Sequence, residues 1–152
     1  AADDAEGARE LGWAADLHEM GLMVSHHDHH RHSAYLLAHV DAPAFSQTQQ
    51  RALANIVLGQ RGGLRKIEEA LADRRFARQV LALRLAVIKC HARGEVRDDA
   101  LALQADGGTA RLRFSQGWAE ARPRTLYLLQ EEAAAWERSG VMKLVLDARQ
   151  RD

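Results

Sequence analysis

The chain has 152 residues, a formal net charge of zero, 47 % hydrophobic residues and 5 % aromatic residues. This length and apolar content suffice for one ordinary domain or two small ones with a real core. No apolar run approaches the roughly 18 residues that cross a bilayer, and the single cysteine, Cys90, excludes an internal disulfide framework. The chain begins without an initiator methionine or a signal pattern. We therefore expect a soluble, cytoplasmic segment of a longer protein that makes no contact with a membrane.

The zero net charge is a cancellation between segments of opposite sign. Residues 1–50 hold 2 basic against 8 acidic side chains, whereas residues 51–97 hold 11 basic against 4 acidic ones. Residues 98–152 are nearly neutral, with 8 basic and 9 acidic side chains. A basic middle segment on a neutral chain favours an anionic ligand or an acidic partner surface, and we expect no specific binding of nucleic acid. Solvated helix faces are the alternative explanation, because arginine is common on helices.

Helical periodicity dominates the first two thirds of the chain. Apolar residues at helical spacing predict a helix over residues 8–22 and a short second helix, "SAYLLAHV", over residues 33–40. An S-x-x-Q capping box predicts a third helix that begins at Gln47 and ends at the glycine pair 62–63.

A fourth predicted helix carries the clearest signals. Asp73 is its expected N-cap, and Gly94 stands just past its expected end. Its apolar stripe places Cys90 in the core as a small apolar residue. The other members of this stripe are Phe76, Val80, Leu83 and Val87.

The sequence period changes after Glu95. The stretch "ALALQADGGTARLRFS" alternates apolar and polar residues around two glycines and predicts a β-hairpin. Pro123 and Gly140 mark the start and the end of a further helix, and "VMKLVLD" after it is typical of a strand. The predicted class is therefore α+β, with a mainly helical domain over residues 1–94 followed by a small β-β-α-β domain over residues 95–152.

The stretch "SHHDHHRHSAYLL" places five histidines within residues 26–32, between two predicted helices. The preceding helix carries His18 and Glu19. This layout resembles HD-type phosphohydrolases, in which His and Asp side chains from several helices hold a divalent metal that activates water. Glu19 stands where that motif has aspartate, and no histidine precedes His18. The only candidate metal ligands are therefore His18 and Glu19, and we expect no bound metal.

A longer resemblance is more specific. Residues 17–66, "LHEMGLMVSHHDHHRHSAYLLAHVDAPAFSQTQQRALANIVLGQRGGLRK", are similar to the C-terminal half of the exopolyphosphatase and guanosine pentaphosphate phosphohydrolase (Ppx/GppA) family. The stretch "FSQGWAEARPRTLYLLQEEAAAW" resembles the small α+β domain that ends those chains. Together these matches cover most of residues 11–146. The resemblance implies that the helical part has an HD-like fold.

The resemblance also implies a function. In this family an actin-like half binds the phosphoanhydride and carries the Mg²⁺-assisted hydrolysis, and this chain shows no segment of that kind. The chain is then expected to be the accessory portion of a phosphoanhydride hydrolase, without catalytic residues or cofactor of its own. It is expected to bind polyphosphate or guanosine pentaphosphate and to support a homodimer.

Seven residues are the expected phosphate contacts. His26, His30 and His32 match the family's loop histidines, whereas His27 and His29 do not match it. The segment "RGGLRK" matches a basic segment of the family, and guanidinium groups around a turn bind phosphate oxygens well. Free amides at the start of the "SAYLL" helix also favour an anion. The full set is His26, His30, Arg31, His32, Arg61, Arg65 and Lys66.

Other interpretations of the same residues remain open. His26 or His30 can instead pack inside the domain and hold the loop by hydrogen bonds. An autonomous metal-dependent HD phosphohydrolase acting on a nucleotide is the alternative function, and it requires a full ligand set. A third possibility is a pure dimerisation domain that binds no anion.

Overall fold

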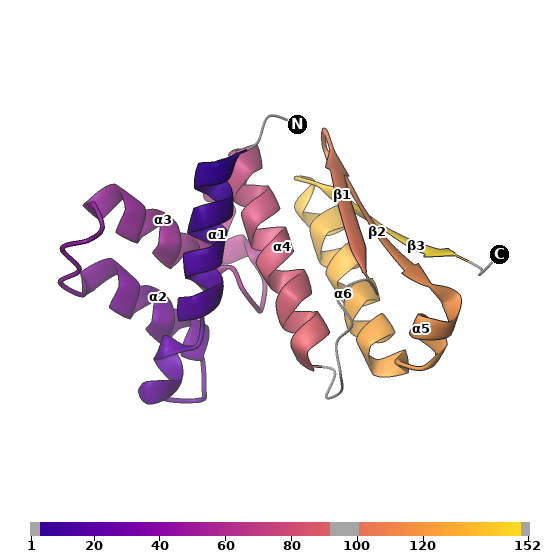
Figure 1. Ribbon diagram of the computed structural model, residues 1–152, viewed down its shortest axis with the longest axis horizontal. Helices are drawn as coiled ribbons and strands as arrows, with labels where there is room; N and C mark the ends of the chain where they lie inside the picture. Colours follow the sequence, from indigo (N-terminus) through magenta and orange to yellow (C-terminus); the bar gives the residue numbers. More distant parts are fainter. Residues whose placement is uncertain (1–3, 92–100, 150–152) are drawn as a thin grey trace. The chain divides into compact units, whose positions relative to one another are not determined.

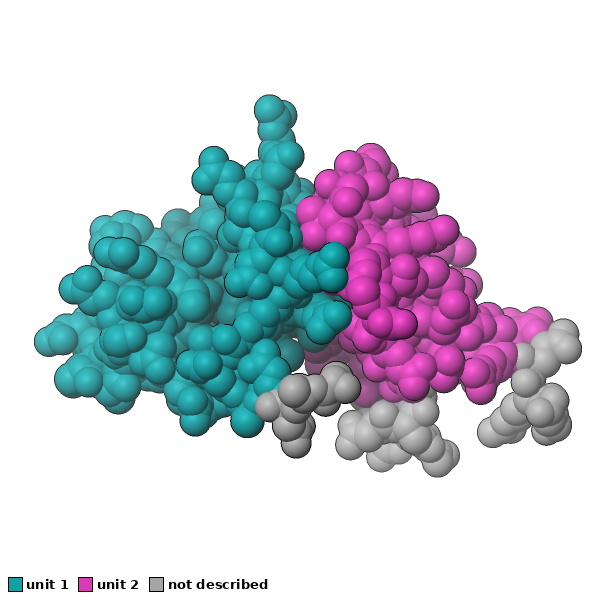
Figure 2. Space-filling view, turned by 90° about the horizontal axis from the view of Figure 1, so that it is seen from above, with its two compact units in different colours: residues 1–84 teal, residues 85–152 magenta. Residues whose placement is uncertain are grey.

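The computed structural model describes residues 4–91 and 101–149. The chain divides into two compact units, Ala1–Arg84 and Leu85–Asp152, which are coloured separately in Figure 2. This division falls within one helix, α4 (Arg74–His91). The boundary predicted from the sequence, after residue 94, lies outside the described residues. The fold is α+β, as predicted, with a helical part followed by a small three-stranded sheet.

The first unit is built from helices. Its α-helices are α1 (Ala5–Leu17), α2 (His29–His39), α3 (Gln47–Leu58) and the first part of α4, and its short 3₁₀ segments are η1 (Met20–Met23), η2 (Leu64–Ile67) and η3 (Ala70–Ala72). Helix α3 packs against both α1 and α2 (Figure 1). The fully buried side chains at the centre of the unit include Leu53, Ile56, Leu71 and Leu81.

Two helix starts follow the predicted capping. Ser46 and Gln49 form the complete capping box at the start of α3, with each side chain bonded to the backbone N–H of the other residue. Asp73 Oδ1 accepts hydrogen bonds from the backbone N–H groups of Arg75 and Phe76 at the start of α4. The capping predicted for the starts of α3 and α4 is therefore confirmed.

Several predicted boundaries differ from the structure. The helix predicted over residues 8–22 is α1, which ends at Leu17 and gives way to a turn and η1. Helix α3 ends at Leu58, before the glycine pair 62–63, because its C-cap is Gly59. A Cβ at Gly59 would lie 2.8 Å from Ile67 Cδ1, so glycine is needed there for close packing. The prediction that Cys90 is a core residue is wrong, since it is exposed near the end of α4.

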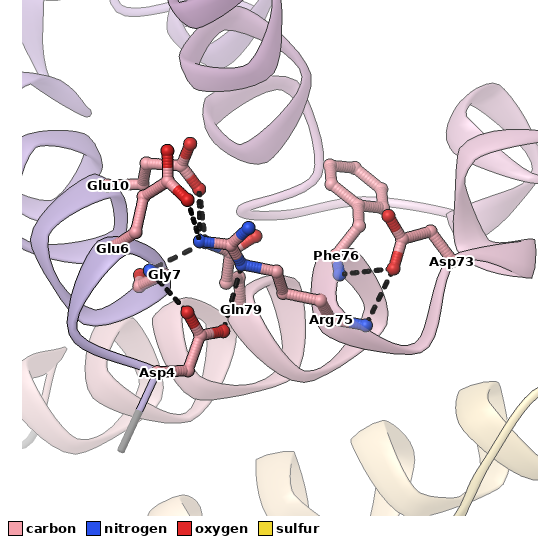
Figure 3. Close-up of polar contacts among 8 residues, drawn as sticks. All are labelled: Asp4, Glu6, Gly7, Glu10, Asp73, Arg75, Phe76 and Gln79. Carbon is pink, nitrogen blue, oxygen red and sulfur yellow. Dashed lines mark hydrogen bonds and ion pairs between the residues drawn. The ribbon is translucent and has the colours of Figure 1, made fainter. Parts of the chain in front are cut away.

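An ion-pair cluster joins the start of α1 to α4 within the first unit (Figure 3). Arg75 Nε lies 2.9 Å from Asp4 Oδ2, and its Nη2 lies 3.3 Å from Glu6 Oε2. On α4, Gln79 Nε2 also donates a hydrogen bond to Glu10 Oε2 of α1. Desolvation lowers the pKa of Arg75, but the hydrogen bond to Glu6 and the charges of the neighbouring carboxylates outweigh it and raise that pKa overall. The cluster thus connects the first turn of α1 to α4.

The second unit contains the predicted β-β-α-β arrangement and one additional short helix. Its elements are β1 (Ala102–Asp106), β2 (Thr109–Ser115), α5 (Gln116–Glu120), α6 (Pro123–Ser139) and β3 (Lys143–Arg149). The sheet order is β1-β2-β3, with β1 antiparallel and β3 parallel to β2. The predicted hairpin is confirmed, with Gly107 at φ +55° in its turn.

Helix α6 covers one face of this sheet (Figure 1). Along β2, Ala110, Leu112 and Phe114 are buried and alternate with more exposed residues. Trp136 of α6 is fully buried, and its indole N–H donates a 2.7 Å hydrogen bond to Glu132 Oε1. No helix within the described residues is long and apolar enough to cross a membrane.

Candidate functional site: a basic pocket at the start of helix α2

The histidine-rich stretch is only partly a loop. Helix α2 begins at His29, four residues before the predicted start at Ser33. Asp28 precedes it in the left-handed conformation, with φ 52°, which aspartate tolerates better than most residues. His26 and His27 are exposed, whereas His29 and His30 are buried in the first turn of the helix, with exposed fractions of 9 % and 6 %.

The buried face of α2 explains why the helix extends to His29. His30, Ser33, Ala34 and Leu37 are all buried and lie at positions i, i+3, i+4 and i+7. This face also holds Gly21 of η1, where a Cβ would lie 2.0 Å from the His29 carbonyl oxygen. Residues 29–32 therefore belong to a packed helix, and the prediction of a loop there is wrong.

Ser33 connects α2 to the preceding "HEMG" segment. Its hydroxyl accepts a 2.7 Å hydrogen bond from the Gly21 N–H and donates a 2.9 Å one to the His18 carbonyl oxygen. Gln60 Nε2 donates to the same carbonyl at 2.8 Å. The backbone of His18 is thus a junction between η1, α2 and the end of α3. We will call Gly21, Ser33, Gln60 and the His18 carbonyl the Ser33 junction.

The His18 side chain takes part in local contacts. Its Nδ1 bonds to the Ala15 carbonyl oxygen, and its Nε2 lies 3.9 Å from Glu19 Oε1. Within residues 4–91 and 101–149, no three His, Cys, Asp or Glu side chains gather closely enough to hold a metal ion. The described residues therefore do not fit the Mg²⁺ that the resemblance implies for the whole enzyme, and the alternative of an autonomous metal hydrolase gains no support from them.

His29 makes a contact that fixes its chemical form. An Arg61 guanidinium nitrogen lies 3.0 Å from His29 Nε2. Because a guanidinium group only donates, Nε2 must accept and Nδ1 must carry the ring hydrogen. Burial, followed by the charge of Arg61, lowers the pKa of His29, in agreement with a neutral ring. The buried Nδ1 has no hydrogen-bond partner among the described residues.

An open pocket of about 470 Å³ lies where the start of α2 meets the turn after α3. Four of its lining side chains are basic or imidazole groups, and two lining residues are glycines that leave the backbone accessible. Asp28 is its one acidic lining residue. The full lining is Asp28, His30, Arg31, Gly62, Gly63, Arg65 and Lys66. We will call it the basic pocket.

The turn after α3 is held in place from α4. Arg84 Nη1 donates hydrogen bonds to the carbonyl oxygens of Gly59 at 2.9 Å and of Gly62 at 3.0 Å. Gly62 has φ +74°, which glycine adopts without strain. Lys66 Nζ donates to the Arg61 carbonyl oxygen across the same turn. The turn therefore presents its basic side chains from a fixed backbone.

Two groups of the basic pocket carry strongly shifted pKa values. Burial and the nearby charge of Lys66 lower the pKa of His30 from 6.5 to about 4. Burial and the charges of Arg84 and Arg31 lower the pKa of Lys66 from 10.5 to about 8. In both cases the carboxylate of Asp28 opposes the shift and does not cancel it. The pocket therefore has an unbalanced positive field, which favours an anion.

The seven expected phosphate contacts occupy different places. His30, Arg31, Arg65 and Lys66 line the basic pocket together. Arg61 lies beside it and bonds to His29 and Lys66. His26 is exposed and His32 half-buried, and neither lines the pocket.

Sequence reasoning missed two residues of this site. His29 does not match the family's loop histidines, yet it is buried and bonded to Arg61. Adjacent positions on a helix point in different directions, so helical spacing does not predict that His29 is buried together with His30. Arg84 is the second of these residues. It lies 22 residues from Gly62, and nothing in their spacing indicates a contact.

The neutral state of buried His30 predicts acid sensitivity. The unfolded chain takes up a proton on this ring near pH 6.5, whereas the folded chain takes it up only near pH 4. The unfolded state thus binds more protons in this window, so the free energy of unfolding falls as the pH is lowered from 6.5 to 4. We expect His30→Gln to flatten this decrease in urea unfolding at several pH values. The exposed His27 is the matched control, and a His27→Gln profile as flat as that of His30→Gln would contradict the prediction.

Comparison with known proteins agrees with this architecture. The family described as Ppx/GppA phosphatase, domain III, matches residues 1–133. The chain belongs to the Ppx/GppA phosphatase family. It is the domain III region of such an enzyme, in the C-terminal part of the family's chains, and the recognition made from the sequence is confirmed.

Two relatives of this Ppx/GppA domain are both named guanosine-5'-triphosphate,3'-diphosphate pyrophosphatase. The protein of that name from Vibrio vulnificus is 35 % identical over 130 residues, which cover 84 % of this chain and 26 % of the relative. The one from Pseudoalteromonas translucida is 32 % identical over 142 residues, which cover 88 % of this chain and 27 % of the relative. The chain thus spans about a quarter of the length of these relatives.

Proposed function

We propose that this Ppx/GppA domain binds the phosphate chain of the enzyme's substrate in the basic pocket and has an accessory, non-catalytic role. The candidate ligands are polyphosphate and guanosine pentaphosphate, and the name of the relatives favours the guanosine compound. The observation that carries the proposal is the convergence of His30, Arg31, Arg65 and Lys66 on one pocket, where Asp28 is the one carboxylate among the described lining residues.

The chemistry of the basic pocket suits a phosphate chain. Arginine forks and a lysine ammonium group donate charge-assisted hydrogen bonds to phosphate oxygens. The start of α2 adds free backbone amides and the positive end of the helix dipole. Buried His30 supplies a further polar atom, Nδ1, that lacks a partner among the described residues. An entering anion would therefore meet the charged side chains of Arg31, Arg65 and Lys66 at the pocket.

Two further parts of the proposal rest on the family. We assign the Mg²⁺-assisted hydrolysis to other parts of the full-length enzyme, since the described residues of this chain do not gather a ligand set. We also propose that the domain forms a homodimer in the cytoplasm. Analytical ultracentrifugation of the 152-residue chain tests the dimer, and a monomer at micromolar concentration would contradict it.

Titration with polyphosphate tests the central proposal. The chain is expected to bind long-chain polyphosphate at roughly 0.02 M salt and much more weakly at roughly 0.2 M salt, because screening shortens the reach of surface charges. Arg65→Ala and Lys66→Ala are each expected to weaken binding about tenfold, as the loss of one charge-assisted hydrogen bond predicts. Isothermal titration calorimetry gives both affinities.

Arg51 supplies the matched control, since it is exposed on α3 and does not line the basic pocket. Arg51→Ala removes the same charge and should change the affinity less than twofold by the same account. Equal losses in Arg51→Ala and Arg65→Ala would show general charge attraction and refute a built site. Absence of binding at low salt would favour a pure assembly domain.

A further inference from the structure

We propose that anion binding in the basic pocket is coupled to proton uptake by Lys66, so that the domain releases phosphate chains as the pH rises above neutrality. This inference rests on the proposed function, because it describes how the same pocket is regulated. Lys66 is the titrating group. A cluster of arginines alone would not make the affinity depend on pH in this range, because guanidinium groups stay charged.

Lys66 is held at the basic pocket. It lies in η2, half-buried, and lines the basic pocket with Arg65. Its ammonium group donates to the Arg61 carbonyl oxygen, which holds it at the pocket rather than in solvent. A Cβ at Gly62 would lie 3.3 Å from Lys66 Nζ, so the lysine folds back closely over the turn.

A set of charged and polar side chains faces Lys66. His30 and Arg31 of α2 and Asp28 just before that helix line the pocket with Lys66. Arg61 acts on Lys66 from the turn after α3, and Arg84 acts on it from α4. Among the described residues, three arginines thus face Lys66 and the Asp28 carboxylate opposes them. Because arginine stays charged at every accessible pH, Lys66 is the cation of this group that can lose its proton near neutrality.

Anion binding changes how fully Lys66 is protonated. Burial and the surrounding arginines lower the pKa of Lys66 to about 8 in the free chain. A phosphate chain adds negative charge within contact distance, which restores the preference for the ammonium form. The bound state therefore holds a proton that the free state partly lacks above pH 7, and by linkage affinity must fall where the free state loses it.

His30 titrates in a separate window. Its pKa of about 4 lies well below the range in which Lys66 loses its proton, so the imidazole stays neutral throughout. A bound anion would raise the pKa of His30 as well, and this adds proton uptake only on the acidic side. Measurements from pH 7 to 9.5 thus report Lys66 without interference from the histidine.

The test follows the affinity of the 152-residue chain for long-chain polyphosphate from pH 7 to 9.5 at constant low salt. Internal phosphates of this probe do not titrate in the range. Because loss of the Lys66 charge is expected to cost about tenfold in affinity, the dissociation constant should stay nearly constant up to pH 7.5, rise above pH 8 and level off at about ten times its value at pH 7. For Lys66→Arg, whatever its affinity at pH 7, the dissociation constant is expected to change less than twofold from pH 7 to 9.5, since guanidinium does not deprotonate.

Lys143, an exposed lysine on β3, is the matched control, and Lys143→Arg should keep the profile of the original chain. Calorimetry of the original chain in buffers of different ionisation enthalpy provides a second measurement that needs no variant. It should show uptake of about half a proton between pH 8 and 9.

The outcomes separate this inference from the proposed function. Binding at pH 7 with a flat pH profile and no proton uptake would overturn the coupling and leave the anion site in place. A Lys66→Arg profile as steep as that of the original chain would also overturn it, because the proton would then belong to another group. A chain that fails to bind at any pH would refute both.

Discussion

Gly21→Ala is expected to lower the free energy of unfolding by about 3 kcal/mol, near the upper end of the usual cost of overpacking. The added methyl group would lie 2.0 Å from the His29 carbonyl oxygen and 2.5 Å from the Ser33 amide nitrogen. Both are backbone atoms of α2 and cannot rotate away. Helix α2 must therefore move from η1, which breaks the 2.7 Å bond between the Gly21 N–H and the Ser33 hydroxyl.

The same change should also weaken polyphosphate binding, because the displaced turn carries His30 and Arg31. Urea unfolding and calorimetric titration measure the two effects. Gly12 in α1 is the matched control, since a Cβ there would meet nothing within 4 Å. Gly12→Ala should stabilise the chain by about 0.5–1 kcal/mol, the ordinary gain of alanine over glycine inside a helix. Two variants of equal stability would contradict the close approach at Gly21.

Trp136→Ala is expected to cost about 3–5 kcal/mol of stability in the second unit, the range for removing a large buried aromatic side chain. The indole is fully buried, and its N–H donates to Glu132 at 2.7 Å. The variant leaves this buried carboxylate without that donor in addition to creating a cavity. The midpoint of unfolding followed by far-UV circular dichroism should shift accordingly.

Tyr127, which is exposed on the same helix, provides the comparison, and Tyr127→Ala should change stability by less than about 0.5 kcal/mol. Every residue of the basic pocket belongs to the first unit. Polyphosphate affinity is therefore expected to survive Trp136→Ala under conditions where the chain stays folded. A tenfold loss of affinity in this variant would show that the pocket depends on the second unit.

Much of the fold was predictable because its signals are local. The capping box at Ser46 and Gln49, the Asp73 cap and the glycine turn of the hairpin each act within a few residues, and each is confirmed. Helix α6 likewise begins at Pro123 and ends just before Gly140, which has φ +69°. Such features need no knowledge of the tertiary structure.

The errors lie where tertiary contacts decide. Nothing local starts a helix at His29, because Asp28 is left-handed and its side chain makes no capping bond to any described residue. The helix extends this far because its first turns pack closely against Gly21 of η1, whose N–H donates to the Ser33 hydroxyl. Cys90 fits the period of the α4 stripe and is nevertheless exposed, because periodicity predicts a face but cannot tell how far along the helix that face is covered.

The candidate site shows the same division. The family resemblance picked out both parts of the chain that meet at the basic pocket, the start of α2 and the "RGGLRK" turn. It could not show which members of each part converge. Convergence depends on Arg84 holding the turn from α4 and on the helical geometry that turns His30 inward.

The most direct test of the account is to map polyphosphate binding on the ¹⁵N-labelled chain by NMR at low salt. If the basic pocket binds the anion, the amide signals of residues 28–32 and 61–66 shift first and most. Those of β1–β3 stay nearly unchanged. Shifts confined to the sheet, or spread evenly over all exposed arginines, would contradict an anion site at the start of α2.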